Sequence, residues 1–151
     1  PVFPRAAGTA GAPAFEMMNW QEIEACAEAG MQIENHTVSH PDLCRLTQEQ
    51  IEEECETADL SIEKQFGRRP RHFAYPYGNY DARVAGIVGE KYQTCVTTVL
   101  LPLGRKLRAA ELPRLDSYYL QNRRDYRHFF SPTASSYLRL RHWLRVFRSR
   151  L

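Results

Sequence analysis

The sequence of 151 residues predicts an α/β domain in which crossover helices join parallel strands. This prediction rests on two observations. Helical and extended patterns alternate through residues 19–98, in the order helix, strand, helix, strand, helix, strand. Polar motifs directly follow two of the predicted strands, and folds of this class bind ligands at the carboxyl ends of their strands. The alternation suits either an open sheet or a (β/α) barrel.

The composition is that of a folded domain without a large charge imbalance. Hydrophobic residues make up 43% of the chain and charged residues 25%, close to the averages of globular proteins, which argues against wholesale disorder. The formal net charge of +2 is too small to indicate a nucleic-acid partner. No apolar run has the length of a transmembrane helix. The four cysteines include no C-x-x-C pair, so neither a zinc ribbon nor a redox motif is expected.

The first predicted helix begins at an N-cap and ends before a glycine. Asn19 and Glu22 have the spacing of a capping box, and Gly30 suits the left-handed residue that often ends a helix. Residues 1–14 are rich in Ala, Gly and Pro and predict a loop. Residues 32–34 predict a short strand that ends just before a polar motif.

The second predicted helix is the longest. Thr47 and Gln50 form a second capping-box pattern, and Gly67 marks the end of the helix. Between them the apolar residues with helical spacing are Ile51, Cys55, Ala58, Ile62 and Phe66. This stripe predicts a buried face opposite an acidic outer face.

Two further strands and a helix follow in the sequence. Residues 73–75 predict a short strand that Pro76 breaks. Asp81 is the expected N-cap of the third helix. The β-branched and aromatic residues at 92–98 predict another strand, and residues 112–115 predict a last short one.

The residues after the first predicted strand have the character of a metal site. His36 and His40 stand four residues apart, and neutral imidazole is the commonest protein ligand of zinc. A helical turn after His36 would place both rings on one face, and the hydroxyls of Thr37 and Ser39 would support them by hydrogen bonds. The alternative is a polar turn with two solvated histidines. The strand-end position, shared with residues 75–80, favours the functional interpretation.

Three segments together resemble the polysaccharide deacetylases, also called family-four carbohydrate esterases. The segment His36-Thr37-Val38-Ser39-His40-Pro41-Asp42-Leu43 is similar to the second motif of that family. The segment Phe73-Ala74-Tyr75-Pro76-Tyr77-Gly78 is similar to the third motif, and Leu112-Pro113-Arg114 resembles a later strand of one branch. The resemblance covers residues 15–118, and ordered motifs are more specific than any one of them alone.

The resemblance implies an incomplete, distorted (β/α) barrel that hydrolyses the carbon–nitrogen bond of N-acetyl groups on a polysaccharide or on peptidoglycan. In the family a divalent metal, usually zinc, is held by an aspartate and two histidines, and the matching histidines here are His36 and His40. The backbone N–H of Tyr77 would stabilise the oxyanion. Arg114 would supply a cation, because Ala74 stands where many members carry an arginine; the alternative for Arg114 is a surface ion pair.

The resemblance also implies a substrate groove lined by Tyr75, Pro76, Asn79 and Tyr80, since aromatic faces suit sugar rings. The first motif of the family, which supplies the aspartate ligand and the catalytic base, is missing, and its expected position lies before Pro1. We therefore expect an N-terminally truncated chain that lacks the first strand and has impaired activity. The alternative is a non-catalytic carbohydrate-binding relic of the same fold.

By the same resemblance, the chain divides into a loop remnant at 1–14, a partial deacetylase domain at 15–120 and a basic segment at 121–151. The last segment predicts a basic amphipathic helix over residues 137–151. Its apolar stripe consists of Leu140, Trp143, Leu144, Phe147 and Leu151. We expect this stripe to pack on the domain; contact with an anionic membrane surface or with a partner is the alternative. The expected location is the cell envelope if an upstream segment carries a signal, and otherwise the cytoplasm.

Overall fold

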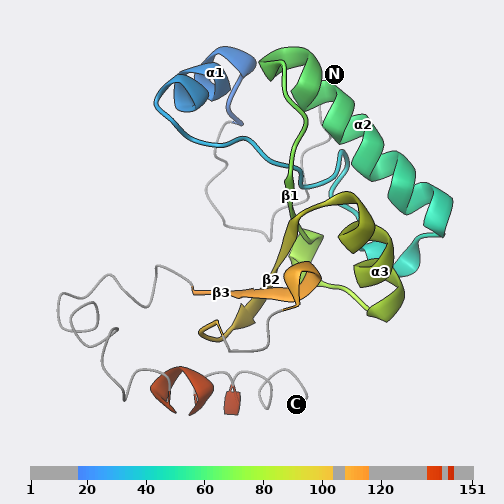
Figure 1. Ribbon diagram of the computed structural model, residues 1–151, viewed down its shortest axis with the longest axis vertical. Helices are drawn as coiled ribbons and strands as arrows, with labels where there is room; N and C mark the ends of the chain where they lie inside the picture. The colour runs from blue at the N-terminus through green and yellow to red at the C-terminus, as the bar shows by residue number, and fades with distance from the viewer. Residues whose placement is uncertain (1–16, 104–107, 116–135, 141–142, 145–151) are drawn as a thin grey trace, which may run out of the picture.

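The computed structural model describes residues 17–103, 108–115, 136–140 and 143–144. These residues contain a three-stranded parallel sheet with the order β1-β2-β3 (Figure 1). The strands are β1 (His72–Ala74), β2 (Thr94–Leu100) and β3 (Leu112–Arg114). The α-helices are α1 (Trp20–Glu28), α2 (Gln48–Phe66) and α3 (Ala82–Lys91), and the short 3₁₀ turns are η1 (Leu43–Arg45), η2 (Pro76–Gly78) and η3 (Ala109–Glu111). The predicted α/β class with parallel strands is confirmed.

The predicted capping boxes begin α1 and α2. The backbone N–H of Glu22 donates to the Asn19 side chain (3.0 Å), and the backbone N–H of Asn19 donates to the Glu22 carboxylate (2.8 Å). Thr47 and Gln50 make the same reciprocal pair at the start of α2. The helix α2 ends at Gly67, whose φ of 68° is left-handed and therefore suits glycine. These local signals decide where both helices lie in the sequence.

The helices α2 and α3 pack with the strands β1 and β2 around one hydrophobic core. Helices α2 and α3 contact each other, and α1 lies at the C-terminal end of α2 (Figure 1), where the Trp20 and Phe66 rings are 6.1 Å apart. The buried core cluster consists of Leu43, Ile51, Cys55, Phe73, Tyr75, Val84, Val88, Tyr92 and Cys95. A large side chain buried in this way stabilises the fold by roughly 1.5–3 kcal/mol. The core therefore holds α2 firmly against the strand β1.

The predicted strand at residues 32–34 is wrong. In the described chain, Asn35 makes a single parallel bridge to Phe73, and no strand precedes it. The reason is the Glu34 side chain, whose carboxylate accepts hydrogen bonds from the backbone N–H groups of Arg71 (2.7 Å) and His72 (3.0 Å). Those N–H groups are satisfied by a side chain rather than by a backbone ladder, so pairing begins one residue later.

Helical residues are described at 136–140 and 143–144, and all but residue 136 fall within the predicted range of 137–151. Leu138 is buried there. The exposed fractions of the predicted apolar stripe are 56% for Leu140, 61% for Trp143 and 47% for Leu144. These three residues therefore do not form the buried stripe that was predicted, and the buried Leu138 lies about 160° around the helix from Leu140.

The rest of the stripe, Phe147 and Leu151, lies outside the described residues. None of the helices described here is long and apolar enough to span a bilayer. Contact of this helix with a membrane surface stays a prediction.

Candidate metal centre

His36 lies at the carboxyl end of β1, the sheet edge that the sequence predicts it to share with residues 75–80, although no strand at residues 32–34 precedes it. It follows the bridge residue Asn35, and its Nδ1 is 2.6 Å from the carbonyl oxygen of Ala74, the last residue of β1. Because a carbonyl oxygen can only accept, Nδ1 carries the proton and donates this hydrogen bond. The lone pair of His36 is therefore on Nε2, which is the arrangement found in metal-binding histidines.

The His40 ring lies against His36. The ring centroids of the two histidines are 4.8 Å apart, and the Tyr77 ring is 4.4 Å from His40 on its other side. The predicted helical turn between the histidines is wrong. Instead Thr37 and His40 have left-handed backbone conformations, with φ of 67° and 57°. Such conformations cost a non-glycine residue about 1–3 kcal/mol each and persist only where the surroundings hold them.

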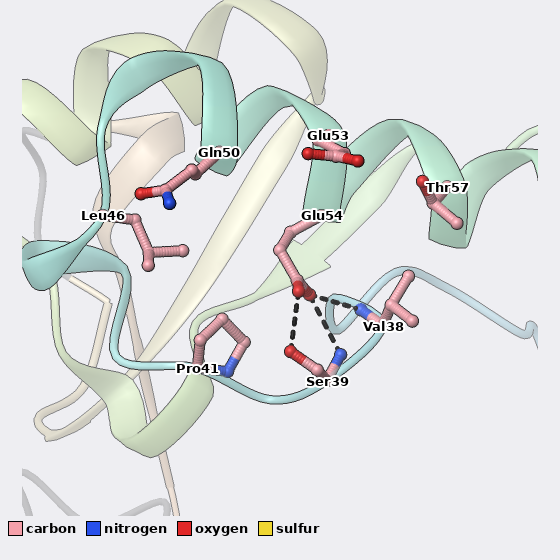
Figure 2. A pocket seen from close by; sticks show the side chains of 8 residues that line it. All are labelled: Val38, Ser39, Pro41, Leu46, Gln50, Glu53, Glu54 and Thr57. Atoms are coloured by element: carbon pink, nitrogen blue, oxygen red, sulfur yellow. Dashed lines mark hydrogen bonds between the residues drawn. The ribbon is translucent and has the colours of Figure 1, made fainter. Parts of the chain in front are cut away.

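Hydrogen bonds hold the loop between the histidines in this strained form. The backbone N–H of Thr37 donates to the side-chain oxygen of Asn35 (2.8 Å), and the backbone N–H of His40 donates to the hydroxyl of Thr37 (3.1 Å). The Glu54 carboxylate on α2 accepts from the backbone N–H groups of Val38 and Ser39 and from the Ser39 hydroxyl (Figure 2). The two hydroxyls thus support the loop backbone.

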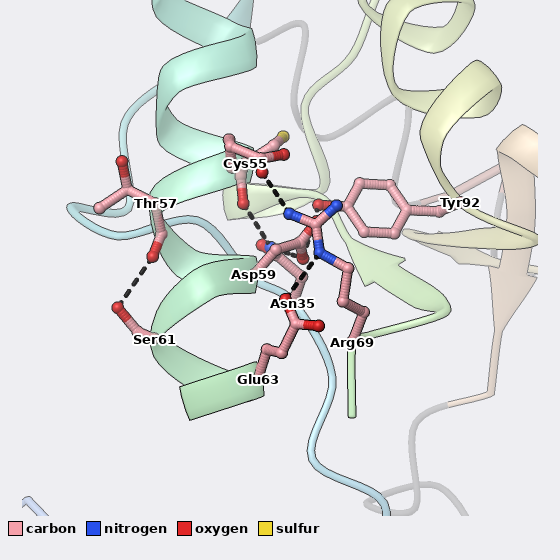
Figure 3. A network of polar contacts seen from close by, with 9 residues as sticks. Asn35, Cys55, Thr57, Asp59, Ser61, Glu63, Arg69 and Tyr92 are labelled. Carbon is pink, nitrogen blue, oxygen red and sulfur yellow. Dashed lines mark hydrogen bonds and ion pairs between the residues drawn. The ribbon is translucent and has the colours of Figure 1, made fainter. Parts of the chain in front are cut away.

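A buried polar network lies directly behind the loop (Figure 3). The side-chain amide of Asn35 donates to the Asp59 carboxylate (2.6 Å) and to the carbonyl oxygen of Cys55 (2.9 Å). The Tyr92 hydroxyl also donates to Asp59, at 3.1 Å. Burial raises the pKa of Asp59, although the hydrogen bonds from Asn35 and Tyr92 oppose this shift. The network fixes Asn35, and through it the start of the histidine loop, to α2.

The electrostatics of the site favour a neutral imidazole. Part of the His36 ring is open to solvent, but its partial burial lowers the pKa, and the nearby His40 and Arg114 lower it further. The hydrogen bond to Ala74 opposes this shift without reversing it. A neutral histidine is the form that binds a metal, so the surroundings of His36 keep it ready for that role.

The loop after β1 places its predicted residues unequally. Tyr77 is 62% exposed and has a left-handed φ of 58°, and Asn79 is exposed. Tyr80 is half-buried and stacks on Tyr75, with ring centroids 5.2 Å apart. The prediction that Tyr75 and Pro76 line a groove is wrong, because both are buried in the core. The Tyr75 hydroxyl donates to the carbonyl oxygen of Ala110 (2.8 Å).

Arg114 reaches the same edge of the sheet from β3. Its Nε donates to the carbonyl oxygen of Thr97 on β2 (2.8 Å), and its charge is close enough to lower the pKa of His36. Among the described residues Arg114 forms this hydrogen bond and no ion pair, in contrast to the surface ion pair that was its alternative. A cation therefore lies beside the histidine pair.

Comparison with known proteins identifies the family of this chain. The family model "Polysaccharide deacetylase" matches residues 8–94, which is more than half of the chain. The chain belongs to the polysaccharide deacetylase family. Members of this family are hydrolases and generally depend on a metal. Among curated proteins, YlxY of Bacillus subtilis (strain 168) is 36% identical over 73 residues, which are 48% of this chain and 23% of that protein.

Solved structures show the same fold. The polysaccharide deacetylase BC0361 from Bacillus cereus superposes with a TM-score of 0.57 at 26% identity, over 65% of this chain and 32% of that chain. The deacetylase PplD of Streptococcus pyogenes, solved with acetate, gives a TM-score of 0.61 at 24% identity, over 65% of this chain and 44% of that chain. The described elements therefore form part of a (β/α) barrel. The chain spans less than half the length of these relatives.

The fold brings together two side chains of a type that binds metals, His36 and His40. The free Nε2 of His36 suits zinc in donor type and in protonation state, and the adjacent His40 ring offers a second imidazole. In the part of the chain that the structure describes, no group of three His, Cys, Asp or Glu side chains could hold a metal ion. The described residues thus fit as one part of a ligand set that needs a further member.

Three supporting residues were missed by the sequence interpretation: Asn35, Glu54 and Asp59. Asp59 left a signal, because it is a charged residue four positions after Cys55 on the apolar face of α2, where it is buried. A carboxylate on that face requires a buried partner. Glu54 has no signal in the sequence that periodicity can detect, since its contacts with residues 38 and 39 depend on how α2 packs.

Proposed function

We propose that this chain supplies the two-histidine part of the metal site in a carbohydrate N-deacetylase that acts on N-acetylated polysaccharide or peptidoglycan. The observation that carries the proposal is the pair of adjacent imidazoles at the carboxyl end of the parallel sheet, with the His36 tautomer fixed by Ala74. Membership of the deacetylase family supports the reaction class. Hydrolysis of the acetamide bond would release acetate and leave a free amine on the sugar.

The chain's own residues have distinct tasks in this proposal. His36 and His40 would hold a divalent metal, with zinc as the expected ion, and a metal bound there would supply Lewis-acid polarisation of the acetamide carbonyl and a water of lowered pKa. The backbone N–H of Tyr77, in the loop beside His40, donates to the oxyanion that develops on the carbonyl. Arg114 contributes positive charge next to His36. The catalytic base and the third ligand are carboxylates outside the described residues.

The sugar is bound by the exposed part of the loop after β1. Tyr77 offers an exposed aromatic face next to the histidines, and Asn79 offers an exposed amide. Tyr80 is accessible only in part. This set replaces the larger groove that the sequence predicted, because Tyr75 and Pro76 belong to the core.

The experiment that tests the proposal is acetate release from N-acetylated chito-oligosaccharides in the presence of zinc. The protein is produced with whatever segment its gene encodes upstream of Pro1, and compared with the variants His36→Ala and His72→Ala. His72 is a matched control because it lies at the opposite end of β1, where its ring bonds to Thr94. We expect His36→Ala to abolish release and His72→Ala to retain it. Full activity of His36→Ala would refute the assigned role.

The same assay distinguishes the non-catalytic alternative. An oligosaccharide that binds the wild-type protein without releasing acetate, at saturating zinc, would indicate a carbohydrate-binding relic. In that case Tyr77→Ala would weaken sugar binding while His36→Ala would leave it unchanged. If the protein is a catalyst, His36→Ala should instead abolish acetate release, since His36 would be essential.

A further inference from the structure

The loop between the two histidines is attached to the rest of the domain by one carboxylate. Glu54 on α2 accepts from the backbone N–H of Val38 at 3.0 Å and from that of Ser39 at 2.9 Å, both through Oε2. Its Oε1 accepts from the Ser39 hydroxyl at 2.6 Å. Figure 2 shows the Glu54 side chain reaching from α2 across to this loop. Among the described residues, these are the hydrogen bonds that join residues 37–40 to another element.

The two histidines differ in how they are held. His36 has an anchor of its own, because its ring bonds to Ala74 and the preceding Asn35 bonds to α2. The orientation of His40 depends on the backbone of the loop, where Thr37 and His40 are both left-handed. Its ring is in contact with the His36 and Tyr77 rings. The placement of His40 is therefore the part of the site that needs support from outside the loop.

We propose that Glu54 is a positioning residue that holds His40 beside His36. The carboxylate fixes the backbone N–H groups of Val38 and Ser39, the two residues before His40, and this keeps the left-handed turn that directs the imidazole toward its partner. The effect of Glu54 on metal binding rests on the function proposed above, whereas its effect on the conformation of the loop does not.

The chemistry of the contact requires a carboxylate. Both oxygens of Glu54 face donors, and one of them accepts from two peptide N–H groups at once. A glutamine at this position would turn an amide N–H₂ toward a donor, so at least one of the hydrogen bonds would be lost. Glu54 acts through the loop rather than on the metal, since no described group of three potential ligands includes it together with the histidines.

The neighbouring residue provides a matched control. Glu53 and Glu54 both line a depression of about 370 Å³ between α2 and the loop, but Glu53 is exposed, and in the described structure the three hydrogen bonds to the loop go to Glu54. The variants Glu54→Gln and Glu53→Gln therefore remove the same charge from the same helix. They differ only in the contact with the loop.

The test combines zinc titration by calorimetry with an NMR signature of the loop. A strong amide–Hα nuclear Overhauser effect within His40 marks its positive φ and needs no metal. We expect Glu54→Gln to lose this signal and to weaken zinc binding about tenfold or more, as for other supports of metal ligands. His36 should keep its protonated Nδ1, and Glu53→Gln should match the wild type. Glu54→Asp, which retains a carboxylate, should recover part of both effects.

The outcomes separate the inference from the proposed function. A folded Glu54→Gln variant with the His40 signal and zinc affinity of the wild type would overturn the role of Glu54. If Glu54→Gln does not fold, Ser39→Ala removes one of the three hydrogen bonds and is measured in the same way. A wild-type chain that binds no zinc, together with loss of the His40 signal in Glu54→Gln, would support the positioning role and overturn the metal site.

Discussion

The chemistry of the site depends first on the state of one ring, that of His36. Its Nδ1 donates to the carbonyl of Ala74, so the Nε2 lone pair faces outward, and its lowered pKa keeps the ring neutral. The hydrogen bond is made at the end of β1, whereas the lowered pKa comes from the partial burial of the ring, with smaller contributions from the nearby His40 and Arg114. A neutral ring with an unprotonated Nε2 is the form in which a histidine can bind a metal.

The lowered pKa of His36 predicts a pH dependence of stability. The folded state binds the second ring proton of His36 more weakly than the unfolded state does. His36 therefore contributes stability at pH values above its ordinary pKa of about 6.5, and this contribution is lost as the pH falls through the pKa of the folded state. Thermal unfolding in the presence of EDTA should therefore show a smaller loss of stability between about pH 7.5 and pH 5.5 in His36→Gln than in the wild type. Equal losses in the two proteins would contradict this assignment.

A second prediction concerns the buried carboxylate of Asp59. Asp59→Leu removes the acceptor of the Asn35 and Tyr92 donors, and should lower the free energy of unfolding at pH 7 by about 1–3 kcal/mol. Asp59→Asn keeps an acceptor oxygen and should cost less than half as much. Since burial raises the pKa of Asp59, its contribution decreases as the pH rises above about 3.9, and Asp59→Asn should remove that decrease. Urea denaturation across this pH range measures both effects. An Asp59→Leu variant as stable as the wild type would be evidence against the network.

Among the elements, the helices could be predicted because their signals are local. Asn19 and Thr47 begin α1 and α2 through contacts within four residues, and Gly67 ends α2. The strand at 32–34 could not be predicted correctly, because the Glu34 side chain takes the donors that a ladder would use. The left-handed turn at His40 depends on Glu54, fourteen positions away, and no periodic pattern reveals such a contact.

The contact between η2 and β2 gives a prediction at this scale. Gly78 has a φ of 72°, and a Cβ there would lie 2.2 Å from the hydroxyl oxygen of Thr98 on β2. Gly67 has a similar φ of 68°, but a Cβ there would meet nothing within 4 Å. Gly67→Ala should therefore lower stability by about 1–2 kcal/mol through backbone strain alone. Gly78→Ala should cost at least about 1 kcal/mol more through overpacking. Equal costs in urea denaturation would show that the loop does not need its close approach to β2.

For the whole molecule, the parallel sheet explains why distant residues meet. The pairings of Asn35 with β1, of β1 with β2 and of β2 with β3 are all parallel. His36, Tyr77 and Arg114 follow or end these segments, so they come together at one edge of the sheet. The sequence predicted this edge because the polar motifs follow apolar strands. The sequence did not predict which aromatic residues are exposed to a ligand. Tyr75 is buried and Tyr77 is exposed, and this difference depends on how the loop folds.

The most direct test of the metal site is a zinc titration of this chain followed by ¹⁵N NMR of its histidine side chains. The geometry predicts that the ¹⁵N resonance of His36 Nε2 shifts when zinc binds, while Nδ1 remains protonated and bonded to the Ala74 carbonyl. The ring ¹⁵N resonances of His40 should shift at the same zinc concentration. His72, at the other end of β1, should not respond. Zinc that leaves both His36 and His40 unchanged, or that binds through the Nδ1 of His36, would contradict the metal site described here.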